Sequence, residues 1–474
     1  MIRSLWPAGL AALLMACSDA GSTGEAAGAG PSGTGTGASG TGASGSGTAT
    51  GGTGGAAPAE PTFVPTRTGI LPGELGVLVN DADPLSVAIA EYYVAAREIP
   101  AANVVHLTLP SSTADSISST DFAPHRDVVL AALEGTDVQA LAITWTKPYR
   151  VENMSITSAL SLGWKAIGDT CTDPNANAAT PNPYAMAPRS SRPWDDLGFR
   201  PSMVIPATTI EEATALIDRG IAADDTWPMG SAHMMVTSDL IRSARCREDP
   251  MYGYVNECQI LLDQWDTASA TDGGSGVAGS IVMADSIVGV TDVLFYVQGL
   301  ASVPDLETNT YVPGAVADHL TSYGGQIPTS GQMSAIEFLR AGATGSFGTV
   351  VEPCAYQQKF PDPALLVPRY FIGGTLIEAY WGSVDWPAEG IFIGEPLARP
   401  WGSGFRTSFA DGTLTIETTT LEPNRVYVIE AADDESGPWE NTAIAVPSVD
   451  KYRRVIITVP NAGRAFYRLR EVVP

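Results

Sequence analysis

The sequence predicts an α/β protein that ends in a short all-β segment, and two observations carry this prediction. In ELGVLVNDADPLSVAIAEYYVAAREIPAANVVHLTL (residues 74–109) a strand pattern, a helical period and a second strand pattern follow one another. Such a βαβ unit is expected to be parallel and right-handed. Beyond Trp401 the pattern changes to short alternating runs separated by DG, EPN, SGP and NAG turns. We therefore expect a doubly wound parallel sheet in residues 67–402 and a small antiparallel β sandwich in residues 403–474.

The first elements follow from apolar spacing. Residues 77–79 form a β-branched run that stops at Asn80, and residues 86–97 place Val87, Ala90 and Tyr93 at helical spacing. Pro100 then separates this helix from the next strand. The same criteria predict a strand over 104–109, a helix over 126–134 and a strand over 140–145.

The strand and helix rhythm returns after a long excursion. Residues 150–200 are rich in proline and asparagine, and a loop of this length inside a domain is usually functional or disordered. Glycines are expected to end the helices at Gly220 and Gly342. The later strands are predicted over 202–206, 232–237, 293–297 and 345–351, and the later helices over 210–220, 334–341 and 375–381.

The N-terminus reads as an export signal. Arg3 precedes an apolar run that ends at Ala16, so residues 1–16 form a signal peptide too short to span a bilayer comfortably. The following Cys17 completes Leu-Met-Ala-Cys, which resembles the bacterial lipoprotein box in which the cysteine is acylated. We therefore expect Cys17 to attach the chain to membrane lipid, with Ser18 favouring the outer membrane and either a periplasmic or a surface-facing body. The alternative is a secreted protein whose Cys17 lies in a discarded peptide.

A tether separates this anchor from the folded body. Residues 17–66 are almost entirely Gly, Ser, Thr, Ala and Pro, a composition that cannot bury enough apolar surface to order itself. The whole chain carries 52 acidic and 26 basic residues, a formal net charge of −26. Such a charge disfavours nucleic acid as a partner.

Four further cysteines lie in the exported part, and an even number in an oxidising compartment favours disulfides. Three pairings are possible. Cys246 and Cys258 flank a loop that contains Pro250 and Gly253, so we pair them, which leaves Cys171 for Cys354.

Seven stretches together resemble a family of exported bacterial proteins found in genomes that carry exosortase, a protein-sorting system associated with extracellular polymer. The resemblance spans residues 74–401 and implies no established activity. One departure is TWTKPYRV, which lacks the glycine of the family's Thr-Lys-Gly-Val-Pro run. The stretches are VNDADPLSVAIAEYYVAAREIPAANV, SRPWDDLGFRPSM, ALIDRGIAADDTWPMGSAHMMVTSD, VPGAVADHLTSYGG, SGQMSAIEFLRAGATGSFGTVVEPC, KFPDP and IFIGEPLARP.

A remoter resemblance concerns caspase-like peptidases of the gingipain kind, in which a strand ends in His-Gly and the next strand ends in the nucleophilic cysteine. Here VLFYVQG (residues 293–299) is similar to the first strand, but Gln298 replaces the histidine. GAVADHLTS, residues 314–322, takes the place of the cysteine strand and contains no cysteine. The resemblance therefore implies a caspase-like body without its catalytic dyad.

Two functions from different classes remain open. A thiol peptidase would use His319 as the general base and Cys354 as the nucleophile. The alternative for Cys354 is a disulfide or a buried thiol, which leaves a non-catalytic binding or assembly factor at the cell envelope. Its partner would be an envelope protein or an extracellular polymer.

Smaller polar clusters have similar alternatives. Asp318, Thr321 and Ser322 lie beside a Gly-Gly turn. They would either bind a ligand at the end of a strand or hydrogen-bond to the backbone of their own loop. Asp81 and Asp83 would ligate a cation or cap a helix, and we favour the cap. The charged residues around Cys354 would line a cleft or pair with one another. Because no HExxH, CxxC pair, EF-hand or P-loop occurs, we expect neither a metal nor a cofactor.

Overall fold

The computed structural model describes residues 60–168, 171, 180–185, 187 and 189–472. The predicted signal peptide, Cys17 and most of the predicted tether lie outside these residues. Residues 59–474 form one compact unit. Within the described ranges, no helix is both long and apolar enough to cross a membrane.

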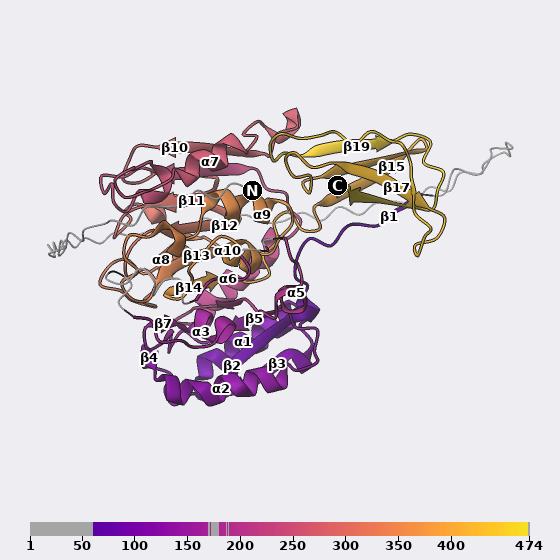
Figure 1. Cartoon of the computed structure of the whole chain (residues 1–474). Coiled ribbons are helices and arrows are strands. Elements are labelled where there is room, and N and C mark those ends of the chain that lie inside the picture. The colour runs from indigo at the N-terminus through magenta and orange to yellow at the C-terminus, as the bar shows by residue number, and fades with distance from the viewer. Residues whose placement is uncertain (1–59, 169–170, 172–179, 186, 188, 473–474) are drawn as a thin grey trace, which may run out of the picture. The chain divides into compact units, whose positions relative to one another are not determined.

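A ten-stranded, mostly parallel sheet forms the centre of this unit (Figure 1). Its spatial order is β10-β9-β11-β12-β13-β14-β8-β5-β2-β3. The strands are β2 (Leu75–Asn80), β3 (Val104–Leu107), β5 (Ala140–Ile143), β8 (Ser202–Val204), β9 (Gly230–Met235), β10 (Val277–Val282), β11 (Val293–Gln298), β12 (Tyr311–His319), β13 (Gly345–Thr349) and β14 (Gly390–Gly394). A mixed α/β architecture is thus confirmed.

The sheet is not parallel throughout. β13 and β14 pair antiparallel, whereas every other neighbouring pair is parallel. The prediction of an entirely parallel sheet was therefore wrong at this one junction. Two helices lie between β13 and β14 in the chain, so the connection returns without the single right-handed crossover that parallel neighbours require. As a result, two parallel half-sheets run in opposite directions.

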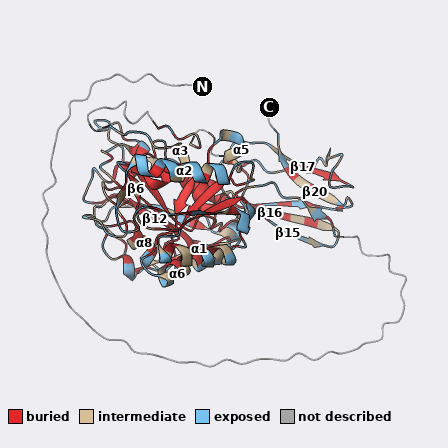
Figure 2. Ribbon diagram, turned by 90° about the horizontal axis from the view of Figure 1, so that it is seen from below, coloured by how far each residue is buried: buried red, intermediate tan, exposed pale blue. Residues whose placement is uncertain are grey.

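Helices cover both faces of the sheet, and Figure 2 shows buried strands between them. Side chains supply several N-caps: Asp83 accepts from the Leu85 amide at 3.0 Å, and Thr209 accepts from the Glu212 amide at 3.3 Å. The helices are α1 (Pro84–Ala96), α2 (Ser119–Ala132), α3 (Ile156–Leu162), α5 (Pro193–Leu197), α6 (Ile210–Ala223), α7 (Glu257–Asp263), α8 (Ile336–Ala341), α9 (Pro363–Phe371) and α10 (Leu376–Trp381). Short 3₁₀ turns are Pro72–Glu74, Ala101–Asn103, Ala244–Cys246, Ala270–Asp272, Leu306–Thr308 and Gln357–Lys359.

Helix α6 continues past the glycine at which we expected it to end. A Cβ built on Gly220 would lie 2.5 Å from Oε2 of Glu395, which is fully buried. Glu395 in turn accepts a hydrogen bond from the Tyr93 hydroxyl at 2.6 Å and pairs with Arg97. The glycine is therefore required by close packing inside the helix and does not terminate it.

The last part of the chain consists of strands with their own apolar cluster, which includes Ile416, Leu421 and Ile429. One sheet has the order β1-β20-β17-β18 and another β15-β16-β19. That this segment is a separate domain stays a prediction. Its strands are β15 (Phe405–Ala410), β16 (Thr413–Thr418), β17 (Tyr427–Ala432), β18 (Glu440–Asn441), β19 (Val455–Val459) and β20 (Phe466–Glu471). The short strands elsewhere are β1 (Thr62–Phe63), β4 (Ser116–Ile117), β6 (Arg150–Val151) and β7 (Met154–Ser155).

Strand β1 falls within the predicted tether and pairs parallel with β20. Phe63 is the reason: its ring lies 5.0 Å from that of Phe405, measured between centroids. A large apolar side chain can repay the entropy of ordering that small residues cannot.

Candidate functional site

Because the two half-sheets run in opposite directions, the carboxyl ends of their strands lie at opposite ends of the sheet. In parallel sheets, ligands bind where the carboxyl ends of the strands meet. Strands β9, β11 and β12 have their carboxyl ends on one side of the sheet, and β8, β5 and β2 have theirs on the opposite side. The chain thus offers two separate candidate positions.

The first position, at the ends of β11 and β12, is occupied by a buried charge pair. Arg245 binds Oδ1 of Asp318 at 2.5 Å, and their side chains are 2% and 5% exposed. Arg245 also donates to the carbonyl oxygens of Gln298 and Pro361 at 3.0 and 3.2 Å. Burial raises the pKa of Asp318, and the guanidinium beside it acts in the opposite direction.

His319 ends β12 and is completely buried. Its Nδ1 lies 2.9 Å from the carbonyl oxygen of Leu300, so Nδ1 carries the proton. Burial lowers the pKa of His319 to about 4. The ring packs edge-on against Phe338. A neutral imidazole enclosed in this way has no route to an external substrate.

The remaining space at this position is very small. The cavity beside Arg245 and Asp318 has a volume of about 10 Å³, at most enough for one water molecule. Thr321 is buried and bonds to Gln332, and the carbonyl oxygen of Ser322 accepts from Thr349 at 2.9 Å. The polar loop therefore satisfies groups of its own fold, and a ligand role for Asp318, Thr321 and Ser322 stays a prediction.

Cys354 is half of a disulfide with Cys171, with a Cα–Cα distance of 5.5 Å. Cys246 and Cys258 form the second disulfide. Of the three pairings that the sequence allows, the structure therefore has the one we favoured. A disulfide sulfur carries no thiolate, so the proposed nucleophile of the His319–Cys354 dyad is absent in this state.

A carboxylate lies beside the Cys171–Cys354 disulfide. Glu352 accepts from the Cys354 amide at 2.8 Å, and one ligand atom from each of these three residues lies within 4.8 Å of the others. Sulfurs bind metals as thiolates, and here both are bonded to each other. The oxidised cluster therefore does not offer a three-ligand metal site.

The second position, at the ends of β2, β5 and β8, is an open cleft of about 390 Å³. Five of its eleven lining residues carry hydroxyl groups, among them Thr144, Thr146 and Thr208, and apolar side chains such as Leu85 and Ile89 line it as well. The Thr146 hydroxyl donates to the Ala207 carbonyl oxygen at 2.8 Å, and Lys147 pairs with Asp115 at 2.6 Å. This volume lies in the range of small-molecule sites. Sequence reasoning missed the cleft, although its TWTKP lining is the stretch that departs from the resembled family.

Most of the other charged residues that the sequence suggested as site residues hold the fold together. Asp83 caps α1, whereas Asp81 pairs with exposed His106 at 2.7 Å, so the cap is the role the structure gives. Of the charged residues around Cys354, Glu352 is exposed and accepts from the Cys354 amide, whereas two others are paired inside the fold. Lys359 binds Glu389 at 2.6 Å, and Arg369 binds Glu378.

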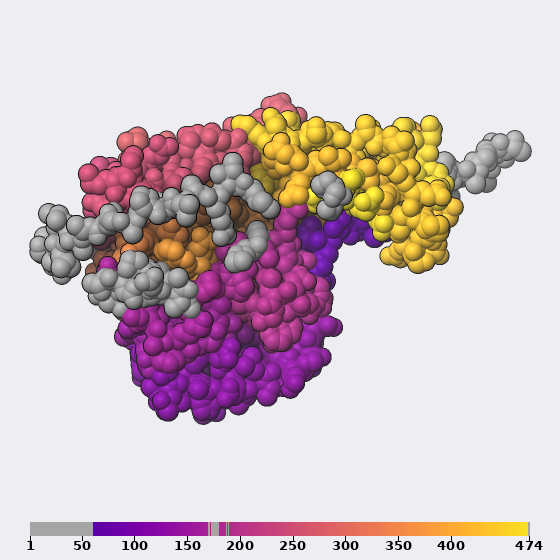
Figure 3. Space-filling view, in the orientation of Figure 1, coloured from indigo at the N-terminus to yellow at the C-terminus, as the bar shows by residue number. Residues whose placement is uncertain are grey.

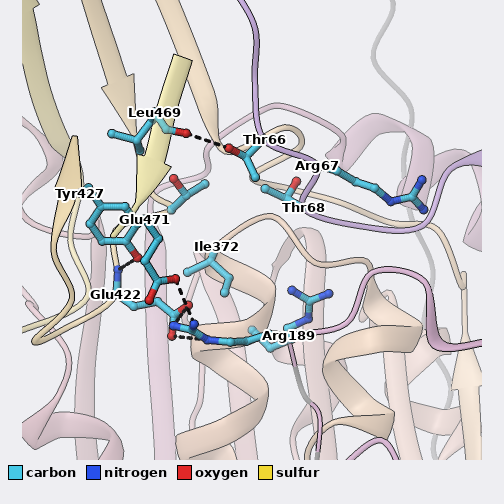
Figure 4. A pocket seen from close by; sticks show the side chains of 11 residues that line it. Thr66, Arg67, Thr68, Arg189, Ile372, Glu422, Tyr427, Leu469 and Glu471 are labelled. Atoms are coloured by element: carbon cyan, nitrogen blue, oxygen red, sulfur yellow. Dashed lines mark hydrogen bonds and ion pairs between the residues drawn. The ribbon is translucent and has the colours of Figure 1, made fainter. Parts of the chain in front are cut away.

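A further pocket of about 200 Å³ lies between residues 66–68 and the C-terminal strands (Figure 4). Arg189 reaches across it to both Glu422 and Glu471. Because these opposite charges neutralise each other, the pocket is a seam of the fold with little charge left for a ligand.

Comparisons with known proteins find two solved structures of low similarity. No protein-family model matches the chain, and no curated protein does. Among solved structures, the complex of Porphyromonas gingivalis RgpB pro- and mature domains aligns with a TM-score of 0.40 and 8% identity, over 84% of this chain and 99% of that one. A protease structure aligns with a TM-score of 0.40 and 10% identity, over 86% and 98%. A likeness at this level establishes neither a shared activity nor a shared substrate.

Proposed function

We propose that this protein is a tethered lipoprotein of the cell envelope that acts as a non-catalytic binding or assembly factor. The observation that carries the proposal is the filled position at the ends of β11 and β12. There Arg245 and Asp318 close the space, His319 is enclosed, and the cavity of about 10 Å³ admits no substrate. Cys354 is meanwhile bound to Cys171.

We further propose that the body is a caspase-like scaffold that has lost its dyad. β11 and β12 are parallel neighbours, as the resemblance implies, and Gln298 and His319 face each other in register at their ends. Gln298 uses its side chain within the fold, donating to the Asp285 carbonyl oxygen at 2.6 Å. The C-terminal strands would form a supporting β sandwich, and membership of the exosortase-associated family would place the protein beside extracellular polymer.

The open cleft is the proposed binding position. Its threonine hydroxyls are uncharged hydrogen-bonding groups, and the two charged residues of its lining, Asp83 and Lys147, have opposite signs. Such a lining suits a neutral, hydroxyl-rich ligand such as a segment of extracellular polymer. An envelope protein that inserts a polar loop would use the same groups.

A peptidase assay tests the non-catalytic role. We expect the purified full chain, with and without reductant, to leave fluorogenic casein uncleaved. Cleavage that appears on reduction and is lost in Cys354→Ala and in His319→Ala would overturn the proposal in favour of the thiol peptidase. Cleavage that persists in Cys354→Ala would indicate a contaminating protease.

The anchor is tested separately. Radiolabelled palmitate should enter the wild-type chain in the bacterial envelope and should not enter Cys17→Ser. Equal incorporation into both chains would exclude lipidation at Cys17. Fractionation of the outer membrane then tests the location.

A further inference from the structure

Strand β10 is an edge of the large sheet, and its sequence does nothing to block pairing. It is first in the strand order, and its one strand partner is β9. Natural edge strands are usually protected by charged side chains, proline, a bulge or short length. Residues 277–284 read VAGSIVMA, without a charge or a proline, and the register with β9 runs unbroken from Val277 to Val282.

The free hydrogen-bonding groups of this edge can be assigned from its pairing. The carbonyl oxygens of Gly276 and Val282 accept from the amides of Gly230 and Val236 on the β9 side. In a parallel ladder alternate residues bond to the same neighbour, so Ala278 and Ser280 also face β9. The N–H and C=O groups of Gly279 and Ile281 therefore point away from the sheet. Helix α7 covers one face here, since Leu262 lies over Gly279, while Ala278 and Ser280 are exposed on the other.

The surroundings of this edge are strongly acidic. Residues 248–339 contain 12 Asp and Glu residues and no Lys or Arg. Four exposed aspartates belong to segments next to β10: Asp263, Asp272, Asp285 and Asp292. The structure shows no ion pair for these four anywhere in its described residues, and Figure 3 shows residues 250–290 at the surface along the upper edge of that view. Two arginines limit the acidic region at the start of β10: Arg453 pairs with Asp266 at 3.4 Å, and Arg454 donates to the Ser275 carbonyl oxygen at 3.2 Å.

We propose that the β10 edge binds an extended, basic segment of another envelope protein by strand addition. Backbone pairing would come from Gly279 and Ile281, and lysines or arginines flanking the segment would meet the four aspartates. A second copy of this chain is the less favourable occupant, because pairing two β10 edges would bring two such acidic regions together. The proposal rests on the binding role inferred above and names the class of partner.

The opposite edge of the sheet lacks these features. β3 has four residues, Val104–Leu107, and carries His106 paired with Asp81. Short length and charged groups are protective devices for an edge strand. The contrast makes β10 the edge at which pairing is left open.

The test uses fluorescein-labelled peptides and the full chain in detergent. The probe is an eight-residue alternating Lys-Val peptide, compared with Glu-Val and with a Lys-Val peptide in which alternate valines are proline. We expect the first to bind, measured by fluorescence anisotropy, and the other two to bind at least about tenfold more weakly, because they lack the charge or the N–H groups. Binding of the Lys-Val peptide should weaken with rising salt.

Variants of the edge identify the site. Ile281→Pro removes an outward N–H without breaking the β9 ladder, and Ile281→Ala is the matched control that keeps it. We expect Ile281→Pro to weaken binding about tenfold relative to Ile281→Ala. Ala278→Lys should weaken it and Ala278→Glu should not, with circular dichroism confirming that each variant is folded.

Equal binding by Ile281→Pro and Ile281→Ala, or equal binding of the Lys-Val and Glu-Val peptides, would overturn the proposal. Concentration-dependent dimerisation that Ile281→Pro abolishes would instead assign the edge to a second copy and also overturn it. The casein assay is independent of these outcomes. Failure of strand addition with casein uncleaved leaves the non-catalytic role standing.

Discussion

Removal of Arg245 should strongly destabilise the fold. In Arg245→Met the carboxylate of Asp318 stays buried, with its side chain 5% exposed, and loses its cationic partner. The carbonyl oxygens of Gln298 and Pro361 lose donors as well. Breaking a buried ion pair by removing one partner typically costs about 3–5 kcal/mol, because the other charge stays buried without compensation. Urea unfolding followed by tryptophan fluorescence measures the change.

The cost should depend on pH in a defined direction. Burial already raises the pKa of Asp318 in the folded state, and loss of Arg245 should raise it further. A carboxyl whose folded pKa exceeds its unfolded value of about 3.9 lowers stability above the folded pKa, and this cost disappears as pH falls toward the unfolded value. The difference between wild type and Arg245→Met should therefore be largest near pH 7 and shrink toward pH 4.

Two controls sharpen this prediction. The double variant Arg245→Met with Asp318→Leu should recover part of the loss, because no buried charge remains. Arg340→Met removes partly exposed pairs with Glu212 and Glu337 and should cost less than about 1 kcal/mol. A pH-independent loss in Arg245→Met, or a double variant that is less stable than the single one, would refute the assignment of a buried charge pair.

Three further predictions concern other parts of the fold. Gly220→Ala, which normally favours a helix by about 1 kcal/mol, should here lower the urea midpoint because the new Cβ would meet Glu395 at 2.5 Å; an unchanged or raised midpoint would contradict the packing. Asp83→Ala should reduce the free energy of unfolding by about 1 kcal/mol through loss of the α1 cap, and Asp83→Asn, which keeps an accepting oxygen, should restore most of it. With increasing dithiol reductant, iodoacetamide should label Cys171 and Cys354 before Cys246 and Cys258. Cys171 is exposed, whereas Cys246 and Cys258 are 3% and 0% exposed. Mass spectrometry that shows the reverse order would contradict this difference in burial between the two disulfides.

Elements whose signal is local were predictable from the sequence. β2, α1 and β11 follow from short apolar periods bounded by Asn, Pro and Gly, and both disulfide partners followed from cysteine spacing and number. β10 was missed, because VAGSIV is mostly small residues without a strong alternation. The end of α6 was misplaced, because a mid-helix glycine looks like a terminator unless the neighbouring Glu395 is known.

The candidate site shows the same division. Residue types alone identified Asp318, His319 and Cys354 as polar groups near strand ends. They favoured a disulfide at Cys354 but left the His319–Cys354 dyad as an open alternative. Arg245 lies 73 residues before Asp318, and only their packing shows that it closes the site. The antiparallel pairing of β13 with β14 likewise depends on contacts between distant segments. It places the filled position at the ends of β11 and β12 on the opposite side of the sheet from the open cleft. The sequence by itself determined the α/β rhythm and the acidity, since these are local or additive properties, and the export features stay a prediction. Tertiary structure alone decided which charges are buried and paired, because burial depends on neighbours that the order of residues does not place.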